Sequence, residues 1–205
     1  MKILRQEIVD LEQVADLCAI GMERKPPTPR DSSKWHVTSL IASSHRIVKG
    51  SISYTDDNVV PPNIRALGYL GRIWETAVDC YLSRYAVLHK GVYVPDMEQE
   101  DDGILGSLDG IMILPELGLV MCETKLRFTI KEEIPLDHVQ QIRAYCHLAD
   151  TDLVCYVSGH VSTAPPAAHA LLRVIRLTKQ SIEETWGMLV NTKKYLEDQG
   201  ITPTG

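Results

Sequence analysis

The sequence predicts an α/β protein in which helices flank a central mixed β-sheet. Residues 103–125, GILGSLDGIMILPELGLVMCETK, read as two apolar strands joined by a turn at Pro115–Gly118. Stretches with apolar residues at helical spacing lie on both sides of this hairpin, and two further short strands follow it. A sheet covered by helices buries the apolar faces of both kinds of element.

The length and composition indicate one soluble globular domain. A chain of 205 residues, 44% hydrophobic and 23% charged, can bury a large core without disulfides. We interpret residues 1–205 as a single domain, with a helical and loop extension at 1–60 and the core at 61–205. No apolar run approaches the length of a membrane span, and the start MKILRQEIVDLEQ is too charged for a signal peptide. We therefore expect a cytoplasmic protein with no membrane partner.

The first sixty residues predict two helices and an arm. Apolar positions between Gln6 and Gly21 recur at helical spacing. The proline-rich run ERKPPTPRDSSK that follows predicts a loop or an extended arm. Residues 35–50 read as a short helix capped by Thr38 or Ser39.

A longer helix is predicted next. Residues 64–88 carry an apolar stripe at helical spacing, preceded by a Pro-Pro start signal. Gly68 and Gly71 each cost about 1 kcal/mol relative to alanine in a helix, which indicates that something packs or approaches closely there. The acidic stretch 96–102, DMEQEDD, predicts a polar loop that leads into the hairpin.

The elements after the hairpin complete the sheet and its cover. Pro135 and Asp137 open a helix, because Asp137 and the glutamine three residues later form a capping-box pattern. Strands are predicted at 153–157 and 171–177, joined by a turn rich in proline and alanine. Ser181 begins a second capping box and with it the last helix.

Three charged residues interrupt the apolar hairpin: Asp109, Glu123 and Lys125. A buried carboxylate or ammonium group is costly unless it is paired or holds a metal. Side chains alternate along a strand, so Glu123 and Lys125 share one face while Thr124 points to the other. If the hairpin pairs about its turn, Asp109 can approach Glu123 across the ladder. Two carboxylates would then share one site.

A pair of carboxylates that is partly open to solvent suits Mg²⁺ or Mn²⁺. These ions keep several waters and bind through one or two carboxylates and a substrate phosphate. Such an ion supports hydrolysis of a phosphodiester, while a nearby ammonium group orients the water or stabilises the developing charge. Lys125 is placed for that second role.

Asp109 followed by the tripeptide 123–125 resembles the D…(D/E)-x-K signature of the PD-(D/E)XK nuclease superfamily. Downstream, Gln141 and Tyr145 match the Q-x-x-x-Y motif of its RecB-like and lambda-exonuclease-like branches. Upstream, residues 71–75, GRIWE, are similar to the G-x-x-x-(H/E) motif of their first core helix. The literal Pro95-Asp96 is not taken as the signature, because it lies among the acids of the predicted loop.

The resemblance implies a restriction-endonuclease-like core and a role for each matching residue. Lys125 would act on the nucleophilic water, and Gln141 and Tyr145 would face outward toward the active-site edge and complete the pocket. For Glu75, a surface acid paired with Arg72 is the alternative. The residues that would hold the metal, Mg²⁺ or Mn²⁺, are Asp109, Glu123, the carbonyl of Thr124 and Glu75.

The resemblance also implies DNA as the partner. Arg127 and Lys131 follow the site and could hold phosphates, as could Arg72. Residues 35–50 are similar to an N-terminal pattern of the iron-sulfur RecB-like enzymes, which makes Arg46 a candidate phosphate contact, with an ordinary surface arginine as the alternative. The net charge of −6 does not exclude DNA, because phosphate contacts need only a local basic strip.

The five cysteines form no C-x-x-C pair, so we expect reduced core thiols and no iron-sulfur cluster. Rings of lambda-exonuclease-like enzymes suggest a homo-oligomer by analogy only.

The expected function is that of a divalent-metal-dependent DNA nuclease. An exonuclease on duplex ends, in recombination, repair or phage DNA metabolism, is favoured because no module that reads a base sequence is recognisable. One alternative is a structure-selective or restriction-type endonuclease on the same core. Others are a catalytically silent nucleic-acid-binding subunit and an unrelated α/β protein with a buried Glu-Lys pair.

Overall fold

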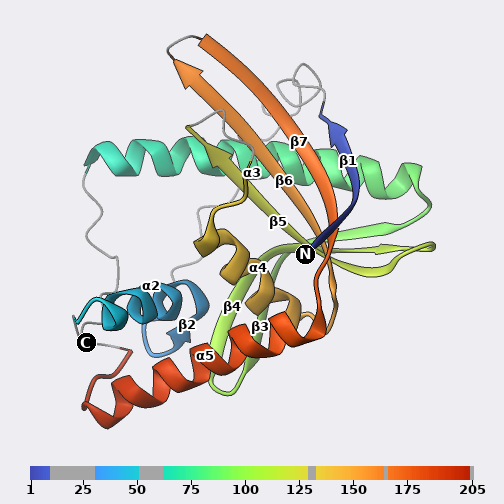
Figure 1. Ribbon diagram of the computed structural model, residues 1–205. Helices are drawn as coiled ribbons and strands as arrows, with labels where there is room; N and C mark the ends of the chain where they lie inside the picture. The colour runs from blue at the N-terminus through green and yellow to red at the C-terminus, as the bar shows by residue number, and fades with distance from the viewer. Residues whose placement is uncertain (10–30, 51–61, 129–132, 164–165, 204–205) are drawn as a thin grey trace.

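The computed structural model describes residues 1–9, 31–50, 62–128, 133–163 and 166–203 (Figure 1). Within these ranges the chain forms seven strands and four helices. In chain order they are β1 Lys2–Ile8, β2 Trp35–His36, α2 Val37–Val48, α3 Pro62–Leu88, β3 Val92–Asp101, β4 Ile104–Leu114, β5 Gly118–Arg127, α4 Leu136–Leu148, β6 Leu153–Thr163, β7 Pro166–Arg176 and α5 Lys179–Asp198.

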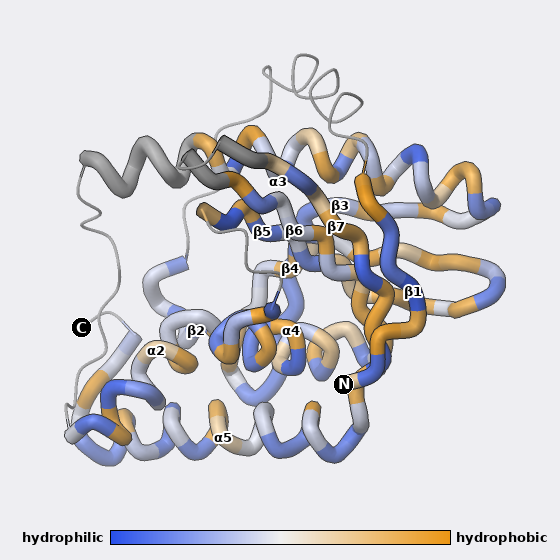
Figure 2. Tube along the Cα trace, turned by 45° about the horizontal axis from the view of Figure 1, so that its top comes forward, coloured by the Kyte–Doolittle hydropathy of each residue, from blue (hydrophilic) through white to orange (hydrophobic). Residues whose placement is uncertain are grey.

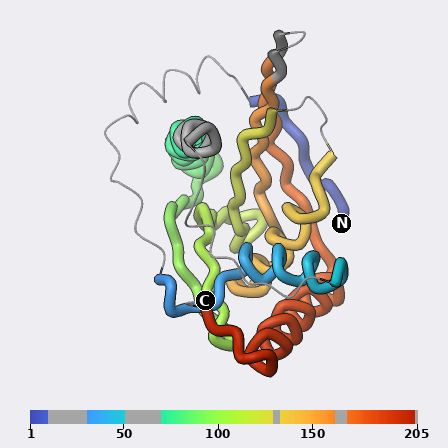
Figure 3. The backbone as a smooth tube through the Cα atoms, turned by 90° about the vertical axis from the view of Figure 1, so that its left-hand side faces the viewer, coloured from blue at the N-terminus to red at the C-terminus, as the bar shows by residue number. Residues whose placement is uncertain are grey.

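The strands form one mixed sheet in the order β1-β7-β6-β5-β4-β2, and β3 pairs with β4. The β4–β5 and β6–β7 hairpins are antiparallel, whereas β5 and β6 run parallel and are connected through α4. Helix α3 covers one face of the sheet, and α4, α5 and α2 lie on the other (Figures 1 and 3). The predicted fold class, a helix-flanked mixed sheet, is confirmed, and it agrees with the core that the resemblance implied.

An apolar layer fills the space on each side of the sheet. Beneath α3, Val78 and Leu82 pack with Cys122 of β5. On the other side, Ile142 of α4 and Leu189 of α5 belong to the second buried cluster. Figure 2 shows α5 mostly in hydrophilic colour with short hydrophobic segments, as expected of a helix with one buried face.

The sheet opens between β4 and β5. These strands pair from the hairpin turn only as far as Gly110 and Cys122. Beyond that pair β5 stays with β6, while β4 continues along β3 and reaches β2 at Ile104. Figure 3 shows β5 running with β6 and β7 while β3 and β4 turn away from them.

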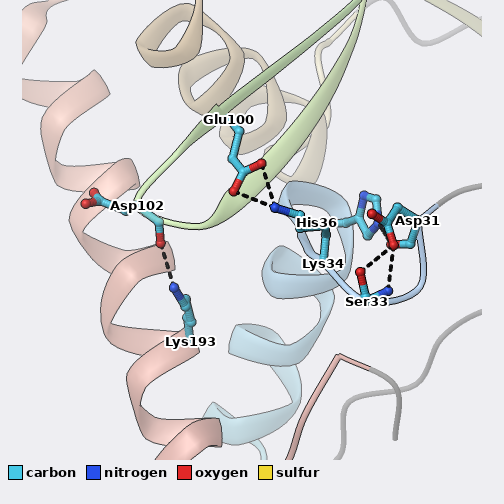
Figure 4. A network of polar contacts seen from close by, with 7 residues as sticks. All are labelled: Asp31, Ser33, Lys34, His36, Glu100, Asp102 and Lys193. Carbon is cyan, nitrogen blue, oxygen red and sulfur yellow. Dashed lines mark hydrogen bonds and ion pairs between the residues drawn. The ribbon is translucent and has the colours of Figure 1, made fainter.

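Polar contacts hold the turn between β3 and β4 in place. Lys34, just before β2, reaches Glu100 of β3, with Nζ–O distances of 2.9 and 3.0 Å (Figure 4). Lys193 of α5 donates to the Asp102 carbonyl oxygen at 2.6 Å, and Trp186 Nε1 donates to the Asp102 carboxylate at 2.9 Å. The start of β4 is therefore tied to both β2 and α5.

Three sequence predictions of secondary structure are wrong. The strands predicted at 153–157 and 171–177 are the longer strands Leu153–Thr163 and Pro166–Arg176, so most of the turn predicted between them is strand. Residues Lys2–Ile8 form strand β1 and not the beginning of a helix from Gln6, while the rest of that predicted helix and most of the proline-rich arm lie outside the described residues. The predicted acidic loop 96–102 belongs largely to strand β3. β3 pairs only with β4 and most of its side chains are exposed, so acidic residues are tolerated there.

The predicted helix caps are also wrong. Helices α2 and α4 begin after His36 and Pro135, and neither residue caps its helix through a side-chain hydrogen bond. Helix α5 is capped by Thr178, whose Oγ1 accepts a hydrogen bond from the Ser181 N–H at 3.2 Å. The helix therefore begins earlier than the predicted capping box at Ser181 implies.

The described cysteines are free, as predicted. Cys122, Cys146 and Cys155 are buried and Cys80 is half-buried, whereas Cys18 lies outside the described residues. None of the described helices has an apolar stretch long enough to cross a membrane.

Two glycines offer a matched test of the packing beneath α3. A Cβ added at Gly159 of β6 would lie 2.9 Å from the ring of Trp74, whereas one at Gly187 of α5 would meet no atom within 4 Å. Gly159→Ala should lower the free energy of unfolding by about 1–3 kcal/mol. Gly187→Ala should raise it by about 0.5–1 kcal/mol, because alanine favours a helix. Urea unfolding would measure both, and equal effects of the two changes would contradict the packing.

Candidate metal centre and active site

The opening of the sheet places two carboxylates side by side. The β4–β5 pairing ends at Gly110 and Cys122. Asp109 is the next residue of β4 beyond this pair, and the same register would place it opposite Glu123. The Thr124 N–H donates to Asp109 Oδ2 at 2.7 Å. The Asp109 side chain thus forms a hydrogen bond between β4 and β5 where their main-chain hydrogen bonds have ended. Asp109 is half-buried and is held against β5 by this hydrogen bond.

Glu123 is the most deeply buried acid of the site. It is 1% exposed, and its Oε1 forms an ion pair with Lys125 Nζ. Its Oε2 has no hydrogen-bond partner within the described part of the chain. Burial, followed by the negative charge of Asp109, raises the pKa of Glu123. An unpaired buried carboxylate oxygen of this kind favours a cation or a water as its partner.

Lys125 supplies positive charge to this group of acids, and its side chain is 25% exposed. Burial by itself lowers the pKa of Lys125, but the carboxylates of Glu123 and Asp109 outweigh that effect and leave it raised. Lys125 therefore stays protonated at neutral pH. It can orient a water or stabilise negative charge, but it does not take up a proton.

Glu75 approaches the same acids from α3. Burial raises the pKa of Glu75 to about 7, and the charge of Asp109 adds to that shift while Lys125 opposes it. The helix thus carries a third carboxylate whose charge interacts with this pair, and its role as a metal ligand stays a prediction. At Gly71 an added Cβ would meet nothing within 4 Å, so the close approach predicted there is not found among the described residues.

The Gln-x-x-x-Tyr pair lies on α4. Gln141 Nε2 donates to Tyr145 Oη at 3.1 Å. Tyr145 was expected to face outward, but it is 3% exposed and packs on Gly106 of β4, where an added Cβ would lie 3.1 Å from its ring. Burial, then the charge of Glu123, raises the pKa of Tyr145. The hydroxyl is therefore part of the interior of the site and not of its rim.

Sequence reasoning missed a second pair next to Lys125. His138 Nδ1 lies 3.0 Å from the hydroxyl of Tyr156, which is fully buried and sits beside Glu123 in the β5–β6 ladder. The available signal was helical spacing, because His138 precedes Gln141 by three residues and lies on the same face of α4.

Two further residues on β3 also went unrecognised. Asp96 is on this strand with a φ of 52°, and its charge contributes to the raised pKa of Asp109, after burial as the main cause. Tyr93 donates to Asp79 Oδ1 of α3 at 2.6 Å and lies over Gly110. The loop placement used to dismiss Asp96 was thus wrong, although Asp109 remains the acid beside Glu123.

The predicted phosphate contacts are only partly brought together. The charge of Arg72 acts on Glu75 from the same helix. Arg127, at the end of β5, donates through Nη1 to the Glu133 carbonyl oxygen at 2.6 Å, and its charge acts on His138. Arg46 lies on α2, which packs against α4 and α5, and Lys131 lies outside the described residues.

The carboxylates of the site are suited to a hard divalent cation that binds few protein ligands. Among the described residues, no three histidine, cysteine, aspartate or glutamate side chains converge as a ready cage. Mg²⁺ and Mn²⁺ need only one or two carboxylates, with water and substrate oxygens completing the shell. Glu123 Oε2 and the neighbouring Asp109 meet that requirement, with Glu75 close enough to interact electrostatically.

No protein-family model matches this sequence, and no curated protein matches it either. Among solved structures, the chain is similar to an alkaline exonuclease from Laribacter hongkongensis, with 13% identity, coverage of 82% of this chain and 89% of that chain, and a TM-score of 0.49. It is also similar to a phage-related exonuclease from Haemophilus somnus 129PT, with 11% identity, coverage of 96% of each chain and a TM-score of 0.42. Likeness at this level leaves the chemistry to the residues of the chain itself.

The carboxylate of Glu75 makes the stability of the metal-free protein depend on pH. Its pKa is raised from 4.5 to about 7, so the folded state binds more protons than the unfolded state in that window. The free energy of unfolding should therefore fall as pH rises from about 5 to 8 in chelator. Glu75→Gln should make this slope shallower, although the raised pKa of Glu123 still contributes to it, and should stabilise the protein at pH 8 by roughly 1–2 kcal/mol. Urea titrations across this range would measure the slope, and an unchanged slope would contradict the burial of an acid at Glu75.

Proposed function

We propose that this protein is a divalent-metal-dependent nuclease that hydrolyses phosphodiester bonds in DNA. The observation that carries the proposal is the carboxylate of Glu123. It is buried, paired on one side with Lys125, lacks a hydrogen-bond partner at Oε2, and faces Asp109 where the sheet opens. Structural roles do not require two carboxylates and an ammonium group in such a place, whereas phosphodiester chemistry uses all three.

Metal binding is proposed at Asp109 and Glu123, with Glu75 and the Thr124 carbonyl as further ligands or water contacts. A bound Mg²⁺ or Mn²⁺ would polarise a phosphate oxygen and lower the pKa of a bound water. The Thr124 N–H, through Asp109 Oδ2, orients one of these carboxylates before any cation arrives.

The remaining polar groups act on the water and the phosphate. Lys125 keeps its proton and stabilises the negative charge that develops on the phosphoryl oxygens. Gln141 donates to Tyr145, which leaves the Tyr145 hydroxyl hydrogen and the Gln141 carbonyl oxygen for a water or the substrate. Arg127, whose charge already acts on His138, is proposed to hold an adjacent phosphate.

Loss of either central residue should abolish turnover while leaving DNA binding intact. Glu123→Gln removes the buried anion and Lys125→Ala the cation, and each should lower the cleavage rate by about 100-fold or more. The dissociation constant for DNA in Ca²⁺ should change by less than about threefold, because backbone contacts elsewhere supply most of the affinity.

The matched control is Glu116→Gln in the exposed β4–β5 turn, which should cleave at the wild-type rate. Equal activity of the Glu123 and Glu116 variants would refute the metal site.

We favour an exonuclease that acts on duplex ends, in recombination, repair or phage DNA metabolism. One digestion experiment distinguishes exonuclease from endonuclease activity. End-labelled linear duplex and a covalently closed circle of the same sequence are incubated with Mg²⁺, Mn²⁺ or chelator. The expected result is metal-dependent loss of the linear form alone. Cleavage of the circle would identify an endonuclease on the same core. No cleavage with either metal would leave a nucleic-acid-binding subunit as the function.

A further inference from the structure

The pair formed by His138 and Tyr156 borders the candidate site, and the proposed chemistry does not use it. Their hydrogen bond joins Nδ1 and the hydroxyl over 3.0 Å. Tyr156 is fully buried at the ladder position beside Glu123, so its ring is fixed relative to the acids. His138 is half-buried on the α4 stripe that also carries Gln141 and Tyr145, three and seven residues further on. The imidazole is therefore held on the same helix face as the recognised motif.

The hydrogen bond also determines which ring nitrogen of His138 carries the proton. The Tyr156 hydroxyl makes no other hydrogen bond with the described residues, and a buried hydroxyl hydrogen needs an acceptor. On this ground we assign Nδ1 as the acceptor, which places the ring proton on Nε2. Nε2 itself has no hydrogen-bond partner in the described part of the chain.

Electrostatics keep this imidazole neutral. Burial, followed by the positive charge of Lys125, lowers the pKa of His138 to about 4. At neutral pH the side chain is therefore an N–H donor without charge. A neutral donor does not compete with a divalent cation for the carboxylates of Glu123 and Asp109, whereas an additional cationic group in this place would.

We propose, on the basis of the nuclease function above, that His138 is a substrate-contacting residue whose Nε2–H donates to a non-bridging oxygen of a phosphate next to the scissile bond. Tyr156 is the positioning residue that holds the ring. The backbone phosphate is the acceptor because it is the strongest one that DNA of every sequence presents. The pair would therefore fix the register of the backbone in the site without reading bases.

Two isosteres of His138 separate the two hydrogen bonds. In His138→Asn the side-chain oxygen takes the place of Nδ1, so the contact with Tyr156 is kept and the Nε2 donor is lost. In His138→Gln the amide NH₂ takes the place of Nε2, so the donor is kept and the Tyr156 contact is lost. A merely structural role would make the Asn variant the milder change, whereas a substrate contact makes it the more harmful one. His45→Asn on α2 is the control.

The test measures kcat/KM on duplexes that each carry one methylphosphonate, which replaces a charged non-bridging oxygen by a methyl group at a single phosphate. A methylphosphonate at one phosphate beside the cut should lower the kcat/KM of the wild type by about tenfold or more. His138→Asn should be about tenfold slower on unmodified DNA and show no further loss at that phosphate, because the contact is already absent. His138→Gln should retain both activity and sensitivity.

The outcomes distinguish this inference from the proposed function. If wild type and His138→Asn cleave equally and lose the same factor at every modified phosphate, His138 does not contact the backbone while the nuclease function stands. If His138→Gln is the slower variant, the histidine acts through Tyr156 and the contact is overturned. If wild type cleaves no DNA with either metal, the proposed function fails and the contact fails with it.

Discussion

The hydrogen bond from the Thr124 N–H to Asp109 Oδ2 is the contact on which the geometry of the site depends. Where β4 separates from β5, main-chain groups at the opening need partners other than those of a continuous ladder. The Asp109 carboxylate accepts the hydrogen bond of the Thr124 N–H only when its side chain points toward β5. The opening of the sheet therefore places the Asp109 carboxylate next to the buried Glu123.

Once Asp109 is fixed, the rest of the site follows from charge compensation. Burial is the main cause that raises the pKa of both carboxylates, and the negative charge of Asp109 raises the pKa of Glu123 further. Lys125 relieves part of this repulsion through its pair with Glu123. The apolar layers on both sides of the sheet hold these groups together, so core packing offsets an arrangement that electrostatics alone would disfavour.

The elements rich in apolar residues were predictable, and the exposed edges were not. The hairpin, its turn and the long helix that begins at Pro62 carry strong periodicity and are found where the sequence predicts them. Strands β1 and β3 lie at edges of the sheet with mostly exposed side chains, so hydrophobic alternation gave little signal. For β3, the available sequence signal was the dipeptide Asp102-Gly103, which is typical of a hairpin turn. The two residues adopt φ of 51° and 69° in the turn between β3 and β4.

The same limit applies to the site. Alternation along one strand is enough to place Glu123 and Lys125 on one face, as the ion pair between them bears out. The burial of Tyr145 depends on how closely α4 approaches Gly106, and the partnership of His138 with Tyr156 depends on tertiary contact. Helical spacing places His138 on the face of Gln141, but it does not identify Tyr156 as the partner of His138.

The three carboxylates reach the opening of the sheet from a helix and two strands that have separate positions in the chain. No single element carries all three carboxylates. Gln141 and Tyr145 come from a further element, the crossover helix α4, which must pack on the sheet to bring them to the site. The complete group therefore exists only when α3, β4, β5 and α4 are packed together. A partly folded or truncated chain has no working fraction of the site, so whatever chemistry these residues perform is confined to the completed molecule.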